Sequence, residues 1–262
     1  MCIRDRDAAG LGHLVEPVRT HLEPLSAYLA MISGQRAPAG HERTTTLYMH
    51  VPRAAGQAVR TALERVIPAA ERQLVYDHAT VEGAIDSEAF AALSEEERTR
   101  LALVFGDFAY GFHRYIPGRA RYVVMLRHPI SRILSLYRAA GRPGPSLESW
   151  VFDDRRIEAD NDMVRRLSGR TDVPFGACTE GMLQDAFDHI EADFEAVLVR
   201  GSMARSAVVL GKAVEAILPT IEVVNADPAG EESFDPPKAE RKRLRHLNHL
   251  DVALFKRYAD AL

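Results

Sequence analysis

The sequence predicts an α/β protein in which helices cover both faces of a central parallel sheet. Expected strands and helices alternate along most of the chain, which is typical of such sheets. Two segments, 44–60 (TTTLYMHVPRAAGQAVR) and 121–139 (RYVVMLRHPISRILSLYRA), each run from a strand through a proline directly into a helix. We therefore expect one large three-layer domain over residues 44–262, preceded by a helical leader over 1–43.

The expected elements follow one another in a regular order. The first strand alternates β-branched and apolar residues, and helical spacing resumes at Val59 and Leu63. Short apolar runs predict further strands at 73–76, 101–105, 122–126, 196–199 and 221–224. Further helices are expected at 14–32, 87–100, 146–154, 160–168, 179–191 and 202–218, with a final pair after a proline-containing acidic loop at 225–237. Ser87 or Ser94 is the expected cap of the helix at 87–100.

The loop that follows the first strand predicts an anion-binding site. Backbone N–H groups at a helix N-terminus point toward a bound phosphate or sulfate, and the helix dipole favours its negative charge. Ala54, Ala55 and Gly56 are small enough for a ligand to approach the backbone closely. Arg53 adds a positive charge to the same loop.

The second strand and helix predict a second anion site. The strand at 122–126 delivers Arg127 at its carboxyl end, and Ser135 follows on the next helix. Two anion sites indicate a ligand with two anionic ends. In a parallel sheet, ligands bind beyond the carboxyl ends of the strands, where we expect Arg53, Asp107 and Arg127.

These two segments resemble the PAPS-dependent sulfotransferases, in particular the carbohydrate and heparan 2-O-type branch and its bacterial relatives. In that family a loop similar to HIPKTGGTS holds the 5′-phosphosulfate, and a segment similar to LRDPVERFLSLYR holds the 3′-phosphate. Here residues 50–58 are HVPRAAGQA and residues 126–138 are LRHPISRILSLYR. The resemblance implies a P-loop-like fold, with Arg127 and Ser135 on the 3′-phosphate. It also implies that the phosphosulfate loop comprises Pro52, Arg53, Ala54, Ala55, Gly56, Gln57 and Ala58.

Three further segments match in the order of the family. Residues 106–111 (GDFAYG) are similar to its GHFPYG segment, and residues 160–169 (DNDMVRRLSG) to its DNLQTRFLSG segment. Residues 247–251 (LNHLD) are similar to its C-terminal NxLD helix. Because the order is kept over 44–262, the resemblance is more specific than either loop alone.

The resemblance implies transfer of the sulfuryl group from PAPS to a hydroxyl, without a metal, and we expect a carbohydrate acceptor. Arg53 stands where the family has a lysine; arginine keeps the positive charge near the leaving PAP but cannot give up a proton. Asp107 stands where the 2-O-type enzymes carry the histidine thought to deprotonate the acceptor, and a carboxylate can also be a base. Alternatively, Asp107 is a turn residue and His113 is the base.

Two other function classes remain open at this point. A nucleoside triphosphate kinase also begins with a strand, a loop and a helix, but the GxxxxGK[ST] motif is absent, which disfavours it. A non-catalytic protein that binds PAP or an anionic glycan on a degenerate sulfotransferase scaffold is the second alternative. The substitutions at Arg53 and Asp107 motivate it.

Composition limits the partners and the location. The net charge of -4 and the pI near 6.2 argue against sequence-independent nucleic-acid binding. Cys2 and Cys178 lie far apart, so neither a disulfide framework nor a zinc site is expected. We expect no membrane span and a cytoplasmic location, because no apolar run of the required length is present. The first residues, MCIRDR, resemble a translated sequencing adapter, so the lack of a signal peptide there is weak evidence on location.

Overall fold

The computed structural model describes residues 44–77, 81–216, 218, 221 and 236–259. The leader predicted over 1–43 lies outside this range, as do nearly all of the predicted strand at 221–224 and most of the loop at 225–237. These predictions therefore remain predictions, and so do the domain limits.

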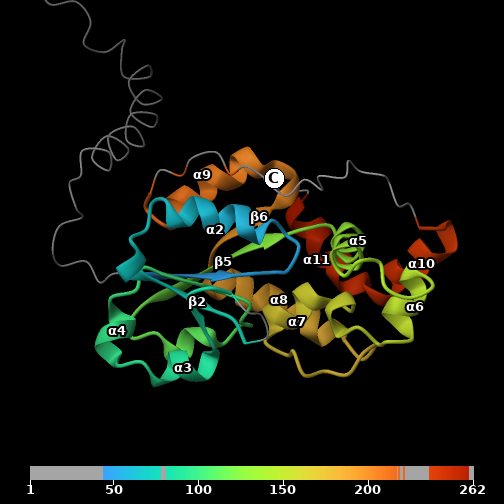
Figure 1. Cartoon of the computed structure of the whole chain (residues 1–262), viewed down its shortest axis with the longest axis horizontal. Helices are drawn as coiled ribbons and strands as arrows, with labels where there is room; N and C mark the ends of the chain where they lie inside the picture. The colour runs from blue at the N-terminus through green and yellow to red at the C-terminus, as the bar shows by residue number, and fades with distance from the viewer. Residues whose placement is uncertain (1–43, 78–80, 217, 219–220, 222–235, 260–262) are drawn as a thin grey trace, which may run out of the picture. The chain divides into compact units, whose positions relative to one another are not determined.

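A six-stranded parallel sheet forms the centre of the described chain (Figure 1). Its strands are β1 (Thr45–Met49), β2 (Arg72–Val75), β3 (Ala84–Ile85), β4 (Leu103–Gly106), β5 (Ala120–Leu126) and β6 (Phe194–Val199). They lie in the order β3-β2-β4-β1-β5-β6, and every neighbouring pair is parallel. The predicted fold class, a three-layer α/β fold with a central parallel sheet, is confirmed.

Helices connect these strands and cover the sheet. They are α2 (Gly56–Glu64), α3 (Ser87–Ala92), α4 (Glu95–Thr99), α5 (Pro129–Ala139), α6 (Leu147–Phe152), α7 (Asp162–Ser168), α8 (Glu180–Asp193), α9 (Met203–Ala213), α10 (Lys238–Leu247) and α11 (His249–Ala259). Short 3-10 turns lie at Ala69–Glu71, Phe112–Tyr115, Ile157–Ala159 and Arg200–Ser202. The helix predicted over 202–218 is shorter than expected, since it ends at Ala213.

The single helix predicted over 87–100 is wrong, because the chain forms two helices there. Asp86, not Ser87, caps α3 by accepting a hydrogen bond from the N–H of Ala89. Ser94 caps α4 in a reciprocal capping box with Glu97. The cap requires an extended backbone at Ser94, so the first helix cannot continue through it.

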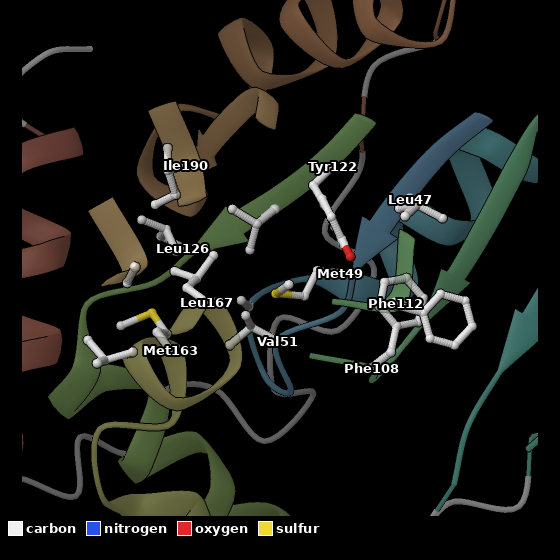
Figure 2. Packing of buried hydrophobic residues seen from close by; sticks show 14 of the residues in the cluster. Leu47, Met49, Val51, Phe108, Phe112, Tyr122, Leu126, Met163, Leu167 and Ile190 are labelled. Atoms are coloured by element: carbon white, nitrogen blue, oxygen red, sulfur yellow. The ribbon is translucent and has the colours of Figure 1, made fainter. Parts of the chain in front are cut away.

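Alternation along the strands sends side chains to two separate cores. Leu47 and Met49 of β1 lie in the cluster that contains residues of α7, α8 and α11, whereas Tyr48 between them packs with α2 and α9. Figure 2 shows the first cluster, in which β1 and β5 meet Leu167 of α7 and Ile190 of α8. Helices therefore cover both faces, and the sheet offers its carboxyl edge as the place for a site.

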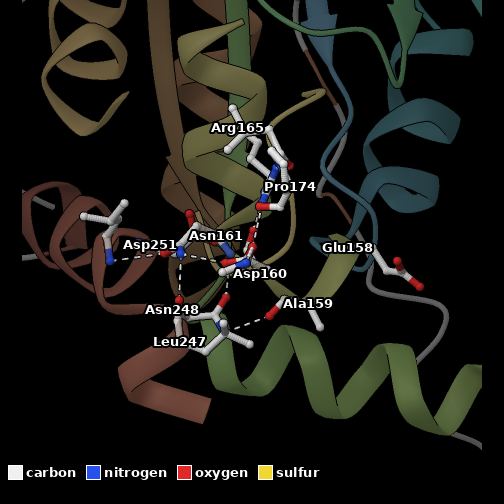
Figure 3. A network of polar contacts seen from close by, with 12 residues as sticks. Glu158, Ala159, Asp160, Asn161, Arg165, Pro174, Leu247, Asn248 and Asp251 are labelled. Carbon is white, nitrogen blue, oxygen red and sulfur yellow. Dashed lines mark hydrogen bonds and ion pairs between the residues drawn. The ribbon is translucent and has the colours of Figure 1, made fainter. Parts of the chain in front are cut away.

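A network of polar groups joins α7 to α11 (Figure 3). The carboxyl oxygens of Asp251 accept hydrogen bonds from the N–H groups of Met163 (3.2 Å) and Val164 (2.8 Å) in the first turn of α7. In return, Asn161 Oδ1 accepts hydrogen bonds from the N–H groups of Leu250 (3.2 Å) and Asp251 (3.1 Å) in the first turn of α11. Each helix start is thus capped by a residue of the other segment, which fixes α7 against the C-terminal helices.

Candidate functional site

The loop between β1 and α2 has an unusual backbone. Arg53 and Ala55 adopt left-handed conformations, with φ of 68° and 71°. For a residue with a Cβ, this conformation costs roughly 1–2 kcal/mol. Ala55 is also the N-cap of α2 and forms no side-chain cap hydrogen bond. Strain of this kind is concentrated at ligand sites, and a helix start with an alanine cap leaves room for an external anion.

Gly56 is required by the close approach of His50. A Cβ at Gly56 would lie 2.1 Å from both Cδ2 and Nε2 of the His50 ring. The hydroxyl of Tyr76 lies 3.2 Å from His50 Nδ1. Burial, and then the positive charge of Arg166, lower the pKa of His50 to about 4, while burial raises the pKa of Tyr76 to about 12. His50 is therefore a neutral packing residue at neutral pH, and Tyr76 keeps its proton.

Three of the predicted binding residues converge. Arg53 Nε donates a hydrogen bond to Ser135 Oγ on α5 (3.0 Å). Arg127 Nη1 donates to the backbone carbonyl of Arg53 (2.8 Å). These contacts join the loop after β1, the end of β5 and the helix α5, although Arg53 and Ser135 are 82 residues apart. The two segments that the sequence singled out therefore form one local structure.

The same place carries concentrated positive charge. Burial lowers the pKa of Arg127 to about 9, and the nearby charges of Arg200, Arg53, Arg138 and Arg132 add to the effect. Arg127 has no ion pair with a carboxylate in the described part of the chain. Arg138 Nε is buried and has no hydrogen-bond partner among the described residues. A cluster of arginines that repel one another becomes favourable when an anion lies between them.

Asp107 lies two strands away from Arg127, at the end of β4. Because β1 separates β4 from β5, about 10 Å of sheet lies between the two strand ends. The N–H of Asp107 donates to the carbonyl of Val75 (3.2 Å), and its Oδ1 accepts a long hydrogen bond from the N–H of Asp77 (3.4 Å). The preceding Gly106 is needed here, since a Cβ would lie 1.9 Å from the Val75 carbonyl oxygen.

His113 is bound to Tyr122 of β5. The Tyr122 hydroxyl accepts hydrogen bonds from the N–H groups of Gly111 (3.1 Å) and His113 (2.9 Å). It therefore turns its own proton to the His113 ring, whose Nδ1 lies 3.1 Å away. This arrangement ties His113 to the first half of β5, and Asp107 remains the better candidate for a base at the carboxyl edge.

No model of a known protein family matches the chain, and no curated protein matches its sequence. Among solved structures, the chain is similar to a sulfotransferase from Alicyclobacillus acidocaldarius. The similarity has a TM-score of 0.46 and a sequence identity of 13%, and it covers 80% of this chain and 93% of that chain. We therefore infer the function from the chain's own residues.

Two further observations concern the described residues as a set. None of the helices that the structure describes is long and apolar enough to cross a membrane. Within the same residues, no group of three or more His, Cys, Asp or Glu side chains is arranged to hold a metal ion.

Sequence reasoning missed two arginines near the candidate site. Arg200 follows β6 directly, so arginines follow the ends of β5 and β6, which are neighbours in the sheet. The Val199-Arg200 junction repeats the strand-then-arginine pattern of Leu126-Arg127 and is a signal that could have revealed it. Arg166 carries no such signal in the sequence, but its guanidinium donates to the carbonyl of Asp107.

Proposed function

We propose that the protein is a sulfotransferase that moves the sulfuryl group from PAPS to a hydroxyl, with a carbohydrate as the acceptor. The observation that carries the proposal is the convergence of Arg53, Arg127 and Ser135 at the carboxyl edge of the sheet. It joins the two segments that are predicted to bind anions, at the place where parallel sheets bind ligands. A nucleotide with a 3′-phosphate and a 5′-phosphosulfate has the two anionic ends that such a site suits.

The donor's two ends would be held by different groups. The 3′-phosphate would bind Arg127 and the Ser135 hydroxyl, where the excess positive charge compensates its negative charge. The 5′-phosphosulfate would lie over the backbone N–H groups of residues 56–58 at the start of α2. Arg53 would stabilise the charge that develops on the bridging oxygen as PAP leaves.

The transfer itself would be an in-line displacement. The acceptor oxygen forms a bond to the sulfur as the bond between sulfur and the bridging oxygen breaks, and the electron pair of that bond leaves with PAP. The proton of the acceptor hydroxyl passes to the Asp107 carboxylate. The separation of Asp107 from Arg127 by β1 suits this mechanism, because the base belongs on the acceptor side of the sulfur.

A non-catalytic nucleotide-binding protein is the second candidate, and one observation favours it. The N–H of Asp77 donates to Asp107 Oδ1, and a hydrogen bond to the charged form makes a carboxylate a weaker base. On this alternative the arginine cluster would still bind PAP, but no sulfuryl group would be transferred.

Incubation of the wild-type protein with PAPS and a broad panel of glycans tests the proposal. We expect the protein to form PAP only when an acceptor is present, and to form a sulfated product at the same time. Chromatography measures both products. Asp107→Asn should lower the rate by about 10²–10⁴-fold, the usual contribution of a general base, while PAP affinity changes little. Asp185→Asn, which alters a carboxylate paired with Arg170 on the surface, is the matched control.

The outcomes separate the two candidates. PAP binding without transfer to any acceptor would select the binding protein. Wild-type activity in Asp107→Asn would remove Asp107 from the mechanism, and no PAP binding at millimolar concentration would refute both candidates.

A further inference from the structure

The segment that carries Asp107 is held at two points by one residue of α7. Arg166 Nη1 donates a hydrogen bond to the backbone carbonyl of Asp107. The carbonyl of Arg166 accepts a hydrogen bond from the N–H of Tyr110 (2.8 Å). Both ends of the segment 107–110 are therefore fixed to Arg166, which is 59 residues away from Asp107 in the sequence.

Arg166 is itself held in place by an acidic partner on the same helix. Its Nε lies 3.2 Å from Oδ1 and 3.3 Å from Oδ2 of Asp162, one helical turn earlier. Both side chains are largely removed from water, with exposures of 15% and 7%. Because both carboxylate oxygens hold Nε of a planar guanidinium, the group has a defined direction, and Nη1 is left to reach the Asp107 carbonyl.

Asp162 also reaches the helix of the arginine cluster. Its Oδ2 lies 3.1 Å from Nη1 of Arg132, which is fully buried on α5. Burial alone would raise the pKa of the Asp162 carboxyl, but the charges of Arg166 and Arg132 outweigh it and hold that pKa below its usual value. Ser135, which binds Arg53, lies three residues after Arg132 on the same helix.

A continuous set of contacts thus links the two halves of the candidate site. It runs from the Asp107 carbonyl to Arg166, then to Asp162, and then to Arg132 on α5. The start of α7, where Asp162 lies, is fixed in turn by Asp251 of α11. A buried ion pair such as Arg166–Asp162 is by itself weak evidence for a role in stability. The hydrogen bond from Arg166 to the Asp107 carbonyl suggests a role in placing Asp107 instead.

We propose that Arg166 is a positioning residue that, through Asp162 and Arg132, holds Asp107 at a fixed distance from the anion site on α5. The proposal rests on the function proposed above, in which Asp107 accepts the proton of the acceptor hydroxyl. Base and donor must be aligned for in-line transfer, and a displacement of about 1 Å can lower a rate by about 10²-fold. Arg166 acts through Asp107 and does not touch the substrate.

Arg166→Met and Arg166→Lys test this role, with Arg170→Met as the control. Arg170 lies one turn further along the chain and pairs on the surface with Asp185 (2.7 Å). We expect Arg166→Met to lower kcat by about 10- to 100-fold while Kd for PAP changes by less than about threefold. Arg166→Lys keeps a charge opposite Asp162 but lacks the forked donors, so an intermediate kcat is expected. Arg166→Lys also provides the test if Arg166→Met does not fold.

A double mutant identifies the route of the effect. If Arg166 acts through Asp107, Arg166→Met should cause no further loss of kcat in an Asp107→Asn background. Full additivity of the two losses would overturn the proposal. A parallel loss of PAP binding and kcat in Arg166→Lys would also overturn it, because it would indicate a general structural role.

Hydrogen exchange provides a measurement that does not depend on activity. The amide of Tyr110 should exchange at least about tenfold faster in Arg166→Lys than in the wild type or in Arg170→Met, whereas amides of β1 and β5 should be unchanged. Unchanged exchange at Tyr110 would refute the positioning role even if the wild type transfers no sulfate. If the wild type transfers no sulfate but Tyr110 still exchanges faster in Arg166→Lys, the failure lies in the proposed function and not in the positioning role.

Discussion

Replacing Arg127 by methionine separates a binding role from a structural one. A hydrogen bond to a charged group contributes about 1.5–3 kcal/mol. Because about 1.4 kcal/mol corresponds to a factor of ten in affinity, we expect Arg127→Met to weaken PAP binding by about 10- to 150-fold. In the absence of ligand, the lost hydrogen bond to the Arg53 carbonyl costs about 0.5–1.5 kcal/mol. Relief of repulsion from the surrounding arginines offsets that cost.

Thermal unfolding with and without PAP measures both effects. At a PAP concentration of about 100 times Kd, ligand binding stabilises the wild type by about 2.7 kcal/mol. For a domain of this size, 1 kcal/mol raises Tm by about 2–4 °C, so the expected shift is about 5–11 °C. At the same concentration, Arg127→Met should retain at most about half of that shift. Its Tm without PAP should differ from the wild-type value by less than about 4 °C.

Arg121→Met is the matched control, since Arg121 lies near the opposite end of the same strand and donates to the carbonyl of Ala192. The control should keep the full PAP shift. The reasoning would be refuted if Arg127→Met also kept the full shift. A fall in Tm of more than about 10 °C without PAP would refute it as well, because Arg127 would then be mainly structural.

Two further variants test the packing around the site. Gly56→Ala should destabilise the fold by about 1–3 kcal/mol through overpacking against His50. Gly181→Ala near the start of α8 should not, because its Cβ would lie at an ordinary contact distance of 3.6 Å from Thr179 Oγ1. A thermal melt of Gly56→Ala that matches the wild type would contradict the packing around His50. Burial raises the pKa of Asp251 from 3.8 to about 7. Between these values the folded state retains a proton that the unfolded state loses, so the free energy of unfolding of the wild type should fall as the pH rises from about 4 to 7. The loss of stability amounts to about 4 kcal/mol. Urea unfolding curves measured across this pH range should show that Asp251→Asn lacks this pH dependence. An unchanged pH dependence in the variant would contradict the assignment to the buried carboxyl group of Asp251.

The parts of the site that follow directly from a strand end were predictable from the sequence. Arg53 and Arg127 each come after a short apolar strand and within two residues of a proline, and parallel strands place such residues on one edge. The spacing of Ser135 on the following helix was enough to predict that it turns back toward that edge. Their convergence required no knowledge of distant contacts.

The order of the strands and the contacts of α7 could not be predicted in this way. Nothing local indicates that β4 lies beside β1, which makes the strand ends before Asp107 and Arg53 neighbours on that edge. A basic residue in a polar segment such as 160–169 gives no local sign of burial, yet Arg165 is buried and donates to Asp160 and to backbone carbonyls. Its acidic partner five residues earlier is visible in the sequence, but the backbone carbonyls of Val173 and Pro174 that Arg165 also binds are not.

The cap of α3 and the role of His113 were also hard to predict, because more than one residue or role fitted the local sequence. Ser87 and Ser94 are both good caps, and the alternative with Asp86 was not considered, although aspartate ranks as highly at this position. His113 looked like a substitute base because histidine titrates near neutrality. Its role depends on Tyr122, whose hydroxyl binds the His113 ring and two backbone N–H groups at once.

The most direct test of the account is calorimetric titration of the wild-type protein with PAP and, separately, with adenosine 5′-phosphate. The two nucleotides differ in the 3′-phosphate that Arg127 and Ser135 would bind. We predict one PAP per chain, bound at least about tenfold more tightly than adenosine 5′-phosphate, because one charge-assisted contact contributes 1.5 kcal/mol or more. Equal affinities for the two nucleotides, or no binding of PAP at millimolar concentration, would contradict the assignment of a two-anion nucleotide site to this edge of the sheet.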